Sequence, residues 1–408
     1  MKIMAHEVYL DNNATTRVLP EVAEAMLPFL TEHYGNPSSI HHFGSAVGER
    51  IAIAREQVAN LIGAADPIEI VFTSCGTEGD NAAIRGILEA RPNKRHIVTT
   101  QVEHPAVLSL CQHLEKKGYR VTWLSVDKSG GLDLEELRSA LTDDTALVSV
   151  MWANNETGVI FPVEQIGAIV KAKGISFHVD AVQAAGKIHL KVKDLPVDLM
   201  TISGHKFYAP KGIGALYVKR GVTFPPFMIG GHQERNRRGG TENVASIIGM
   251  GKAAEVASSR IDSDAPRITK LRDQLEALLL GSCPGSRVNG VEQTRLPNTC
   301  NISFRYLEGE SILVLLDQQG ICASTGSACT AGSSEPSHVL RAMKVPPDWL
   351  QGAVRFSLGR FTTEEEIHYV NEKMPTIVQR LEGLSSLGRL GGRPADKPAA
   401  AVTMRARG

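Results

Sequence analysis

Residues 198–207 read Asp-Leu-Met-Thr-Ile-Ser-Gly-His-Lys-Phe, an apolar run that ends in small and polar residues and a lysine. The run predicts a buried β-strand followed directly by a loop. Similar strand runs occur before and after it, and helical patterns separate several of them. The other strand runs begin at Ile68, Arg95, Arg120, Ala146, Ile175 and Gly214, and the helical patterns cover 77–89, 105–117, 134–141 and 163–173. The alternation predicts an α/β fold with a large, mostly parallel sheet and helices on both faces, which binds ligands at the carboxyl ends of its strands.

The pattern of the sequence changes after Gly240. A long helical region is expected from Asn243 to about Leu280, interrupted near Asp264-Ala-Pro266, and an α+β pattern follows from Asn298 to about Leu384. We therefore expect a large domain over 15–260 and a smaller α+β domain formed by 1–14 and 261–386. The Gly/Ala/Pro-rich tail over 387–408 has little to bury, and we expect it to be disordered.

Composition favours an ordinary globular protein. Of 408 residues, 42% are hydrophobic, and 44 Lys+Arg balance 44 Asp+Glu, which favours neither nucleic acid nor an anionic membrane as a partner. No apolar run approaches the roughly 20 residues of a membrane helix, and the N-terminus has no apolar signal core. The six cysteines are too few for a disulfide framework. We expect a soluble, cytoplasmic protein with reduced thiols.

Two residues at predicted strand ends suggest a specific chemistry. Lys206 follows the strand that begins at Asp198, and a desolvated lysine there can form a Schiff base, although a lone lysine is more often a surface residue. Ser203 and His205 flank it with hydrogen-bonding capacity for a phosphate. Asp180 ends the strand from Ile175, where a carboxylate could pair with a pyridine nitrogen or could simply cap a following helix.

Three further positions follow predicted strands. The turn at Gly76-Thr77 can direct backbone N–H groups at a phosphate, or can be an ordinary strand-to-helix connection. His104 could stack on a planar cofactor and move protons, although a lone histidine is more often structural. Asn155 could bind a ring substituent or serve only as a turn residue.

Cys329 differs from the other cysteines because it lies in a run of Gly, Ser, Ala and Thr, within a loop over about 323–334. A cysteine on a polar, Gly-containing loop can be exposed and act as a nucleophile, although an incidental surface thiol is the alternative. No cysteine pair has the spacing of a zinc site.

The sequence resembles cysteine desulfurases, which are fold-type-I pyridoxal phosphate enzymes, from about residue 8 to 380. The resemblance rests on seven motifs: Tyr9-Leu-Asp-Asn-Asn-Ala-Thr-Thr, Tyr34-Gly-Asn-Pro-Ser-Ser, Asn154-Asn-Glu-Thr-Gly, Ser203-Gly-His-Lys, Arg238-Gly-Gly-Thr-Glu-Asn, Thr325-Gly-Ser-Ala-Cys-Thr and Arg355-Phe-Ser-Leu-Gly-Arg. Asp11-Asn-Asn and Met151-Trp-Ala-Asn-Asn-Glu-Thr-Gly are most similar to the nitrogen-fixation (NifS-like) branch.

The resemblance implies roles for individual residues. Lys206 would hold pyridoxal 5'-phosphate and act as the base at the substrate Cα, and Cys329 would take the sulfur of L-cysteine as a persulfide. The resemblance assigns cofactor contacts to Gly76, Thr77, His104, Asn155, Asp180, Gln183, Ser203, His205 and Thr241, the last from the other subunit of a homodimer. Arg355, with Asn36 and Asn155, would bind the substrate.

The resemblance also implies partners and alternatives. The sulfur acceptor would be an iron–sulfur scaffold protein, on which Cys329 would transiently share a cluster iron, and no intrinsic metal is expected. A selenocysteine lyase, or another lyase or aminotransferase with the same cofactor, is the alternative within catalysis. A non-catalytic sulfur carrier with this fold is the alternative outside it.

Overall fold

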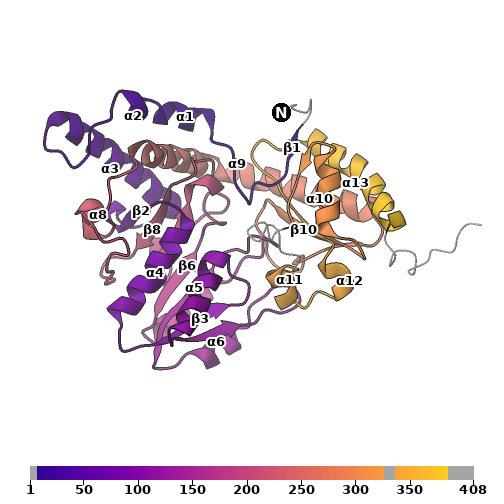
Figure 1. Cartoon of the computed structure of the whole chain (residues 1–408), viewed down its shortest axis with the longest axis horizontal. Coiled ribbons are helices and arrows are strands. Elements are labelled where there is room, and N and C mark those ends of the chain that lie inside the picture. The colour runs from indigo at the N-terminus through magenta and orange to yellow at the C-terminus, as the bar shows by residue number, and fades with distance from the viewer. Residues whose placement is uncertain (1–6, 326–335, 385–408) are drawn as a thin grey trace, which may run out of the picture.

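The largest element of the structure, a computed structural model that describes residues 7–325 and 336–384, is a seven-stranded sheet (Figure 1). Its order is β2-β8-β7-β6-β5-β3-β4, and only β8 runs antiparallel to its neighbours. The strands are β2 (Ile70–Thr73), β3 (His96–Thr100), β4 (Arg120–Leu124), β5 (Thr145–Met151), β6 (Ser176–Asp180), β7 (Leu199–Ser203) and β8 (Gly214–Val218). The prediction of a mostly parallel sheet is confirmed.

Helices cover both faces of this sheet because its central strands are apolar on both sides. In β5, Leu147 packs with helices α4 and α5, whereas Val148 packs with α3, α7 and α9 on the opposite face. The helices of this part of the chain are α1 (Pro20–Met26), α2 (Pro28–Thr31), α3 (His42–Ile62), α4 (Gly76–Ala90), α5 (Pro105–Lys116), α6 (Leu134–Ala140), α7 (Val163–Ala172), α8 (Gln233–Asn236) and α9 (Val244–Ser282).

A smaller group of elements follows α9 in the chain and lies on the opposite side of the molecule from α3 and α8 (Figure 1). It contains an antiparallel sheet of order β12-β10-β9 and a parallel pair, β1 with β11. Its elements are β1 (Val8–Tyr9), β9 (Ser286–Val288), β10 (Thr299–Phe304), α10 (Gly309–Asp317), β11 (Ile321–Cys322), α11 (His338–Ala342), α12 (Pro347–Leu350), β12 (Ala353–Ser357) and α13 (Glu364–Leu384). The N-terminal strand β1 thus pairs with β11 of the C-terminal part, and the grouping of 1–14 with 261–386 into one domain stays a prediction.

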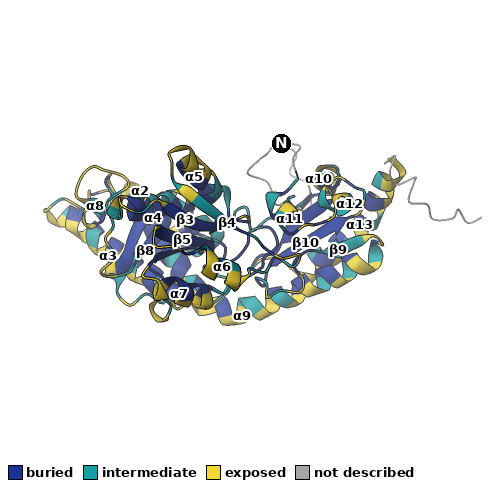
Figure 2. Ribbon diagram, turned by 90° about the horizontal axis from the view of Figure 1, so that it is seen from below, coloured by how far each residue is buried: buried dark blue, intermediate teal, exposed yellow. Residues whose placement is uncertain are grey.

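The interruption expected near Pro266 is wrong, because α9 is one helix of 39 residues that contains this proline. Contacts on both sides of Pro266 hold the helix in place: Asp264 accepts a hydrogen bond from Arg360 Nε at 2.7 Å, and Arg267 donates to two carbonyl oxygens of the loop before α13. Tertiary contacts here outweigh the helix-breaking tendency of proline. Figure 2 shows α9 along one side of the molecule with an exposed outer surface.

Two hydrophobic cores lie at the two ends of α9. Its residues up to Ala257 pack into the core of the large sheet, and those from Ile268 pack with β10, β12 and α13. The large-sheet core also includes α11, through Val339 and Leu340. The proposed domain division at about residue 260 rests on these two cores. The expected tail over 387–408 lies outside the described residues.

Candidate active site

Lys206 ends a short 3-10 helix (Gly204–Lys206) that directly follows β7. Its Nζ donates to the main-chain oxygens of Asn13, at 2.7 Å, and Ala14, at 2.8 Å. Both carbonyls belong to the segment after β1, so the N-terminus of the chain fixes the amine at the carboxyl edge of the large sheet. Lys206 is therefore held within the fold and is not a freely solvated surface lysine.

Asp180 is the last residue of β6, next to β7, and is 5% exposed. Burial raises the pKa of its carboxyl to about 6, although the Val182 N–H and the Lys206 amine lower it. One carboxylate oxygen accepts from Val182 N at 2.9 Å, and turns rather than a helix follow over 182–187. The hydrogen bond expected if Asp180 simply caps the next segment is therefore present, but that segment is a turn and not a helix. A buried carboxylate beside an amine suits a cationic ring nitrogen.

His104 precedes α5 and caps it, because its Nδ1 accepts from Ala106 N at 3.1 Å. Burial, followed by the charges of Lys206 and His338, lowers the pKa of its imidazole to about 4. His104 is therefore neutral near pH 7, and a ring whose Nδ1 accepts a hydrogen bond carries its proton on Nε2. The residue therefore caps α5 through Nδ1 and carries an N–H on Nε2.

The N-terminus of α4 lies next to Ser203 at the end of β7, and together they offer hydrogen-bond donors suited to an anion. No side chain caps α4, which begins at Gly76, and the buried Ser203 Oγ has no hydrogen-bond partner among the described residues. A Cβ built on Gly76 would lie 2.9 Å from Val182 Cγ2, so a side chain at this position would force Val182 to shift, and it would also lie 3.9 Å from Ser203 Oγ. Free helix N–H groups next to an unsatisfied hydroxyl form a phosphate cradle. Thr77 is exposed in the first turn of α4.

His205 adjoins the same edge through its hydrogen bond to Thr15, with Nδ1 3.2 Å from Oγ1. Burial, followed by the charges of nearby lysines, lowers the pKa of its ring to about 4. It is therefore neutral and can donate one hydrogen bond to an anion without adding charge.

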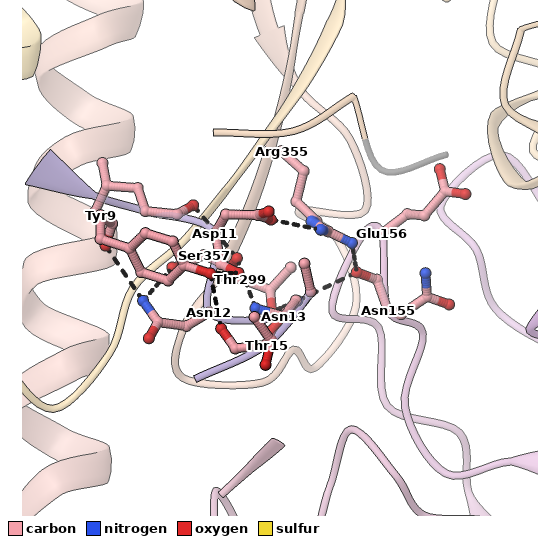
Figure 3. Close-up of polar contacts among 12 residues, drawn as sticks. Tyr9, Asp11, Asn12, Asn13, Thr15, Asn155, Glu156, Thr299, Arg355 and Ser357 are labelled. Carbon is pink, nitrogen blue, oxygen red and sulfur yellow. Dashed lines mark hydrogen bonds and ion pairs between the residues drawn. The ribbon is translucent and has the colours of Figure 1, made fainter. Parts of the chain in front are cut away.

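Asn13 connects these residues, and the sequence analysis did not assign it a role. Its main-chain oxygen accepts from Lys206 Nζ and, at 3.0 Å, from Gln183 Nε2. Its Nδ2 donates to the main-chain oxygen of Asn155 at 3.2 Å and to Thr299 Oγ1 at 2.8 Å (Figure 3). The only signal in the sequence is the polar run Asp11-Asn-Asn after a two-residue strand.

Arg355 lies on β12 and is 2% exposed. Its guanidinium donates to Asp11 Oδ1 at 2.8 Å and to the main-chain oxygen of Asn155 at 2.9 Å (Figure 3). Its Nε is buried and has no partner among the described residues. The structure therefore brings Arg355 and Asn155 together, and the unused donor suits a further anionic group.

The remaining predicted residues lie at other places. Asn36 is exposed between α2 and α3, and its Oδ1 accepts from Ser38 N at 2.9 Å. Thr241 is also exposed and lines a pocket with Ser74, two residues before Gly76. The described contacts do not bring Asn36 or Thr241 to Lys206.

Cys329 lies outside the described residues, but the chain on both sides of its loop is placed. Before the loop, Ser324 pairs with Arg355 through two backbone hydrogen bonds of 3.2 and 2.6 Å. After it, Ser337 Oγ donates to Glu156 Oε2 at 2.6 Å, next to Asn155. The loop thus leaves and rejoins the described chain beside the substrate-binding candidates.

Four of the five cysteines of the described chain are in surroundings that disfavour the thiolate, the form that reacts. All five described cysteines are free of disulfide bonds. Burial is the main cause that raises the pKa of the Cys111 thiol to about 12. Burial also raises the pKa of the thiols of Cys283, Cys300 and Cys322. The placed residues contain no group of three or more His, Cys, Asp or Glu side chains able to hold a metal ion. No helix in 7–325 or 336–384 is long and apolar enough to cross a membrane.

The family model for Aminotransferase class-V matches residues 8–370. The chain belongs to this family, among its cysteine desulfurases. It is 62% identical over 378 residues to the cysteine desulfurase of Trichormus azollae, a match that covers 93% of this chain and 94% of the relative. It is 54% identical over 392 residues to "Cysteine desulfurase NifS" of Azotobacter vinelandii, covering 96% and 97%.

A solved structure titled "NIFS-LIKE PROTEIN" has a TM-score of 0.87 and 41% identity, and the match covers 92% of this chain and 100% of that one. The predicted family and fold class are therefore confirmed, and the protein is an enzyme of a pyridoxal phosphate-dependent family.

Proposed function

We propose that the protein holds pyridoxal 5'-phosphate on Lys206, converts L-cysteine to L-alanine and transfers the sulfur to Cys329 as a persulfide. One observation carries the proposal: a fixed lysine, a buried carboxylate and an anion cradle lie together at the carboxyl edge of one sheet. The unsatisfied Ser203 hydroxyl beside Gly76 fits a phosphate, and Asp180 fits a protonated ring nitrogen.

The residues of this edge divide into three groups around the cofactor. Asp180 pairs with the ring nitrogen and His104 stacks on the ring, while Asn155 and Gln183 bind its hydroxyl. The phosphate is held by Gly76, Thr77, Ser203 and His205, with Thr241 contributed by the second subunit of a homodimer. When bound, pyridoxal phosphate supplies an electron sink for the pair left behind when the substrate Cα loses its proton.

Arg355 binds the carboxylate of L-cysteine, with Asn36 and Asn155 as further contacts. Two neighbouring guanidinium nitrogens, Nε and Nη2, can supply two parallel N–H donors for a carboxylate. Nε has no partner among the described residues, and Nη2 donates to Asp11. Because Asp11 competes for the same donor, the substrate must displace or share this ion pair.

Lys206 and Cys329 move the proton and the sulfur. Lys206 Nζ takes the proton from the substrate Cα, and the thiolate of Cys329 attacks the substrate sulfur. One S–S bond forms as the Cβ–S bond breaks, and the electron pair of that bond goes to Cβ, which takes up one proton. Cα then regains the proton that Lys206 removed, which completes L-alanine. His104, which is neutral near pH 7, lies near enough to Lys206 for the lysine's positive charge to lower the pKa of its imidazole.

The persulfide is then delivered to an iron–sulfur scaffold protein, on which Cys329 transiently shares a cluster iron. We further propose that these clusters serve nitrogenase and that the reaction takes place in the cytoplasm. The NifS name of the Azotobacter vinelandii relative supports the link to nitrogen fixation. The two ends of the Cys329 loop support this delivery. Ser324, before the loop, pairs with Arg355, and Ser337, after it, contacts Glu156.

The test is to incubate the purified, cofactor-loaded protein with L-cysteine or L-selenocysteine and to quantify alanine, sulfide and selenide. A cysteine desulfurase forms alanine from L-cysteine with a matched yield of sulfur. Alanine from L-selenocysteine alone would indicate the lyase alternative. Amino transfer to a 2-oxo acid without sulfur release would indicate an aminotransferase.

A further inference from the structure

A second lysine, Lys187, lies in the wall of the pocket that Lys206 also lines. Its Nζ donates to Gln183 Oε1 at 2.6 Å and to Asn13 Oδ1 at 3.1 Å. None of the roles assigned above uses Lys187. It nevertheless contacts Asn13, whose main-chain oxygen accepts from Lys206, and Gln183, which donates to that same oxygen.

The direction of these bonds fixes the orientation of the Gln183 amide. The Lys187 amine is the donor in both contacts, so it meets the oxygen end of each amide. With its oxygen held by Lys187, Gln183 points its Nε2 at the main-chain oxygen of Asn13, 3.0 Å away. That oxygen is the same one that accepts from Lys206 Nζ at 2.7 Å. The N–H end of Gln183 therefore faces the reactive lysine.

Asn13 is oriented in the same way. Its Oδ1 accepts from Lys187 and, at 2.9 Å, from Asn298 Nδ2, so its Nδ2 is left to donate to the main-chain oxygen of Asn155. Asn155 in turn contacts Arg355. Lys187 thus donates hydrogen bonds directly to Gln183 and to Asn13. Asn13 connects the Lys206 site to the Arg355 site.

The charges around Lys187 are unfavourable for an ordinary lysine. Burial, followed by the positive charges of Lys206 and Arg355, lowers the pKa of its amine well below the usual range. Arg360 and Asp264, already paired with each other, line the same pocket. Placing an amine here costs stability, which argues for a role beyond packing.

We propose that Lys187 is a positioning residue of the active site, which holds the Gln183 amide with its N–H end toward Lys206 so that it can donate to the cofactor's ring hydroxyl. The inference rests on the proposed function, because it presupposes that pyridoxal phosphate binds here and that the Gln183 N–H donates to its ring hydroxyl. Replacing Lys187 removes the contact to the amide oxygen and leaves the Gln183 amide held only by the Asn13 main-chain oxygen, so its orientation is less firmly fixed.

The experiment is a double-mutant cycle with Lys187→Met and Gln183→Leu, measured on each apoenzyme titrated with pyridoxal phosphate. The readouts are the dissociation constant and the absorption maximum of the bound cofactor. Lys193→Met, an exposed lysine six positions later, is the matched control. Lys187→Gln, which keeps one N–H donor, is included in case Lys187→Met does not fold by circular dichroism.

We expect Lys187→Met to weaken cofactor binding by about tenfold, the size of a lost hydrogen bond to a charged group, and to shift the absorption maximum. In the Gln183→Leu background the same change should have less than half of that effect, because the residue through which it acts is gone. Lys187→Gln should fall between Lys187→Met and the wild type.

Equal effects of Lys187→Met in the two backgrounds, or a variant with the affinity and spectrum of Lys193→Met, would overturn the inference. If Lys187→Met does not fold, Lys187→Gln with wild-type affinity and spectrum would overturn it equally. A wild-type protein that gives no absorption band with pyridoxal phosphate would overturn the proposed function itself, a result distinct from both.

Discussion

The Arg355 guanidinium donates to the Asp11 carboxylate at 2.8 Å, although 344 positions separate the two residues in the chain. The pair joins β12 to the segment after β1, on the side of the site where the substrate carboxylate is proposed to bind. Arg355 therefore has an anionic partner that the substrate must displace or share.

Replacement of Arg355 by lysine should weaken substrate binding selectively. Lysine keeps the charge but lacks the planar pair of N–H donors, so we expect the KM for L-cysteine to rise about tenfold or more, on the scale of a lost bidentate contact. The visible band should be unchanged because Arg355 does not hold the cofactor. Steady-state kinetics with absorption spectra check this, and an unchanged KM would contradict the assignment.

Ser203→Ala should change apoenzyme stability and cofactor affinity in opposite directions. Removing a buried hydroxyl without a partner should stabilise the apoenzyme by about 1 kcal/mol, whereas losing a phosphate donor should weaken cofactor binding about tenfold. Urea unfolding of the apoenzyme and titration with pyridoxal phosphate measure the two effects.

The matched control for this prediction is Ser149→Ala. The Ser149 hydroxyl is also buried but lies 2.9 Å from His178 Nδ1. Its removal should destabilise the apoenzyme and leave cofactor affinity unchanged. Loss of stability in Ser203→Ala with wild-type cofactor affinity would show that the hydroxyl has no part in the cradle.

Lys206→Ala should remove the visible absorption of the covalently held cofactor, because the carbonyls of Asn13 and Ala14 position this amine at the sheet edge where the cofactor is proposed to bind. Free pyridoxal phosphate added to the variant should remain separable by gel filtration at low concentration. A variant with the wild-type spectrum would refute the covalent role of Lys206.

Glu103 gives a pH-dependent prediction. Its carboxyl is buried, and burial raises its pKa from the ordinary 4.5 to about 8, despite hydrogen bonds from Thr100 and Met151 N–H. The folded protein therefore binds this proton more tightly than the unfolded chain does. The stabilisation is complete below about pH 4.5 and is lost as the pH rises through about 8.

Glu103→Gln cannot ionise, so the unfolding free energy of the wild type should fall relative to the variant between about pH 5 and 9. A change of more than about 1.4 kcal/mol, one pK unit, is expected. Urea unfolding across this range tests it, with the exposed Glu292→Gln as control. A constant difference between wild type and Glu103→Gln would contradict the raised pKa.

The sequence predicted the parts of the fold that local patterns determine. The strands Arg120–Leu124 and Gly214–Val218 have the predicted bounds, because each is an apolar or β-branched run next to turn residues. Lys206 and Asp180 were predicted because Asp180 ends one apolar strand run and Lys206 closely follows another. The structure places these strands, β6 and β7, side by side in parallel.

Long-range contacts were not predictable in this way. The roles of Asn13 and Lys187 depend on hydrogen bonds between residues up to 285 positions apart, which no local pattern encodes. The continuity of α9 through Pro266 likewise depends on Arg360 and on the loop before α13. Residues that act through a distant partner are therefore recognised only once the chain is folded.

The most direct test of the central claim is a single turnover of cofactor-loaded protein with limiting L-cysteine, followed by mass mapping of the peptide that contains Cys329. The account predicts one alanine and one added sulfur atom on Cys329 for each L-cysteine consumed. Cys329→Ala should keep the visible band and form neither the persulfide nor sulfide at the normal rate. Normal sulfide release by Cys329→Ala, or the added sulfur on any other cysteine, would contradict the account.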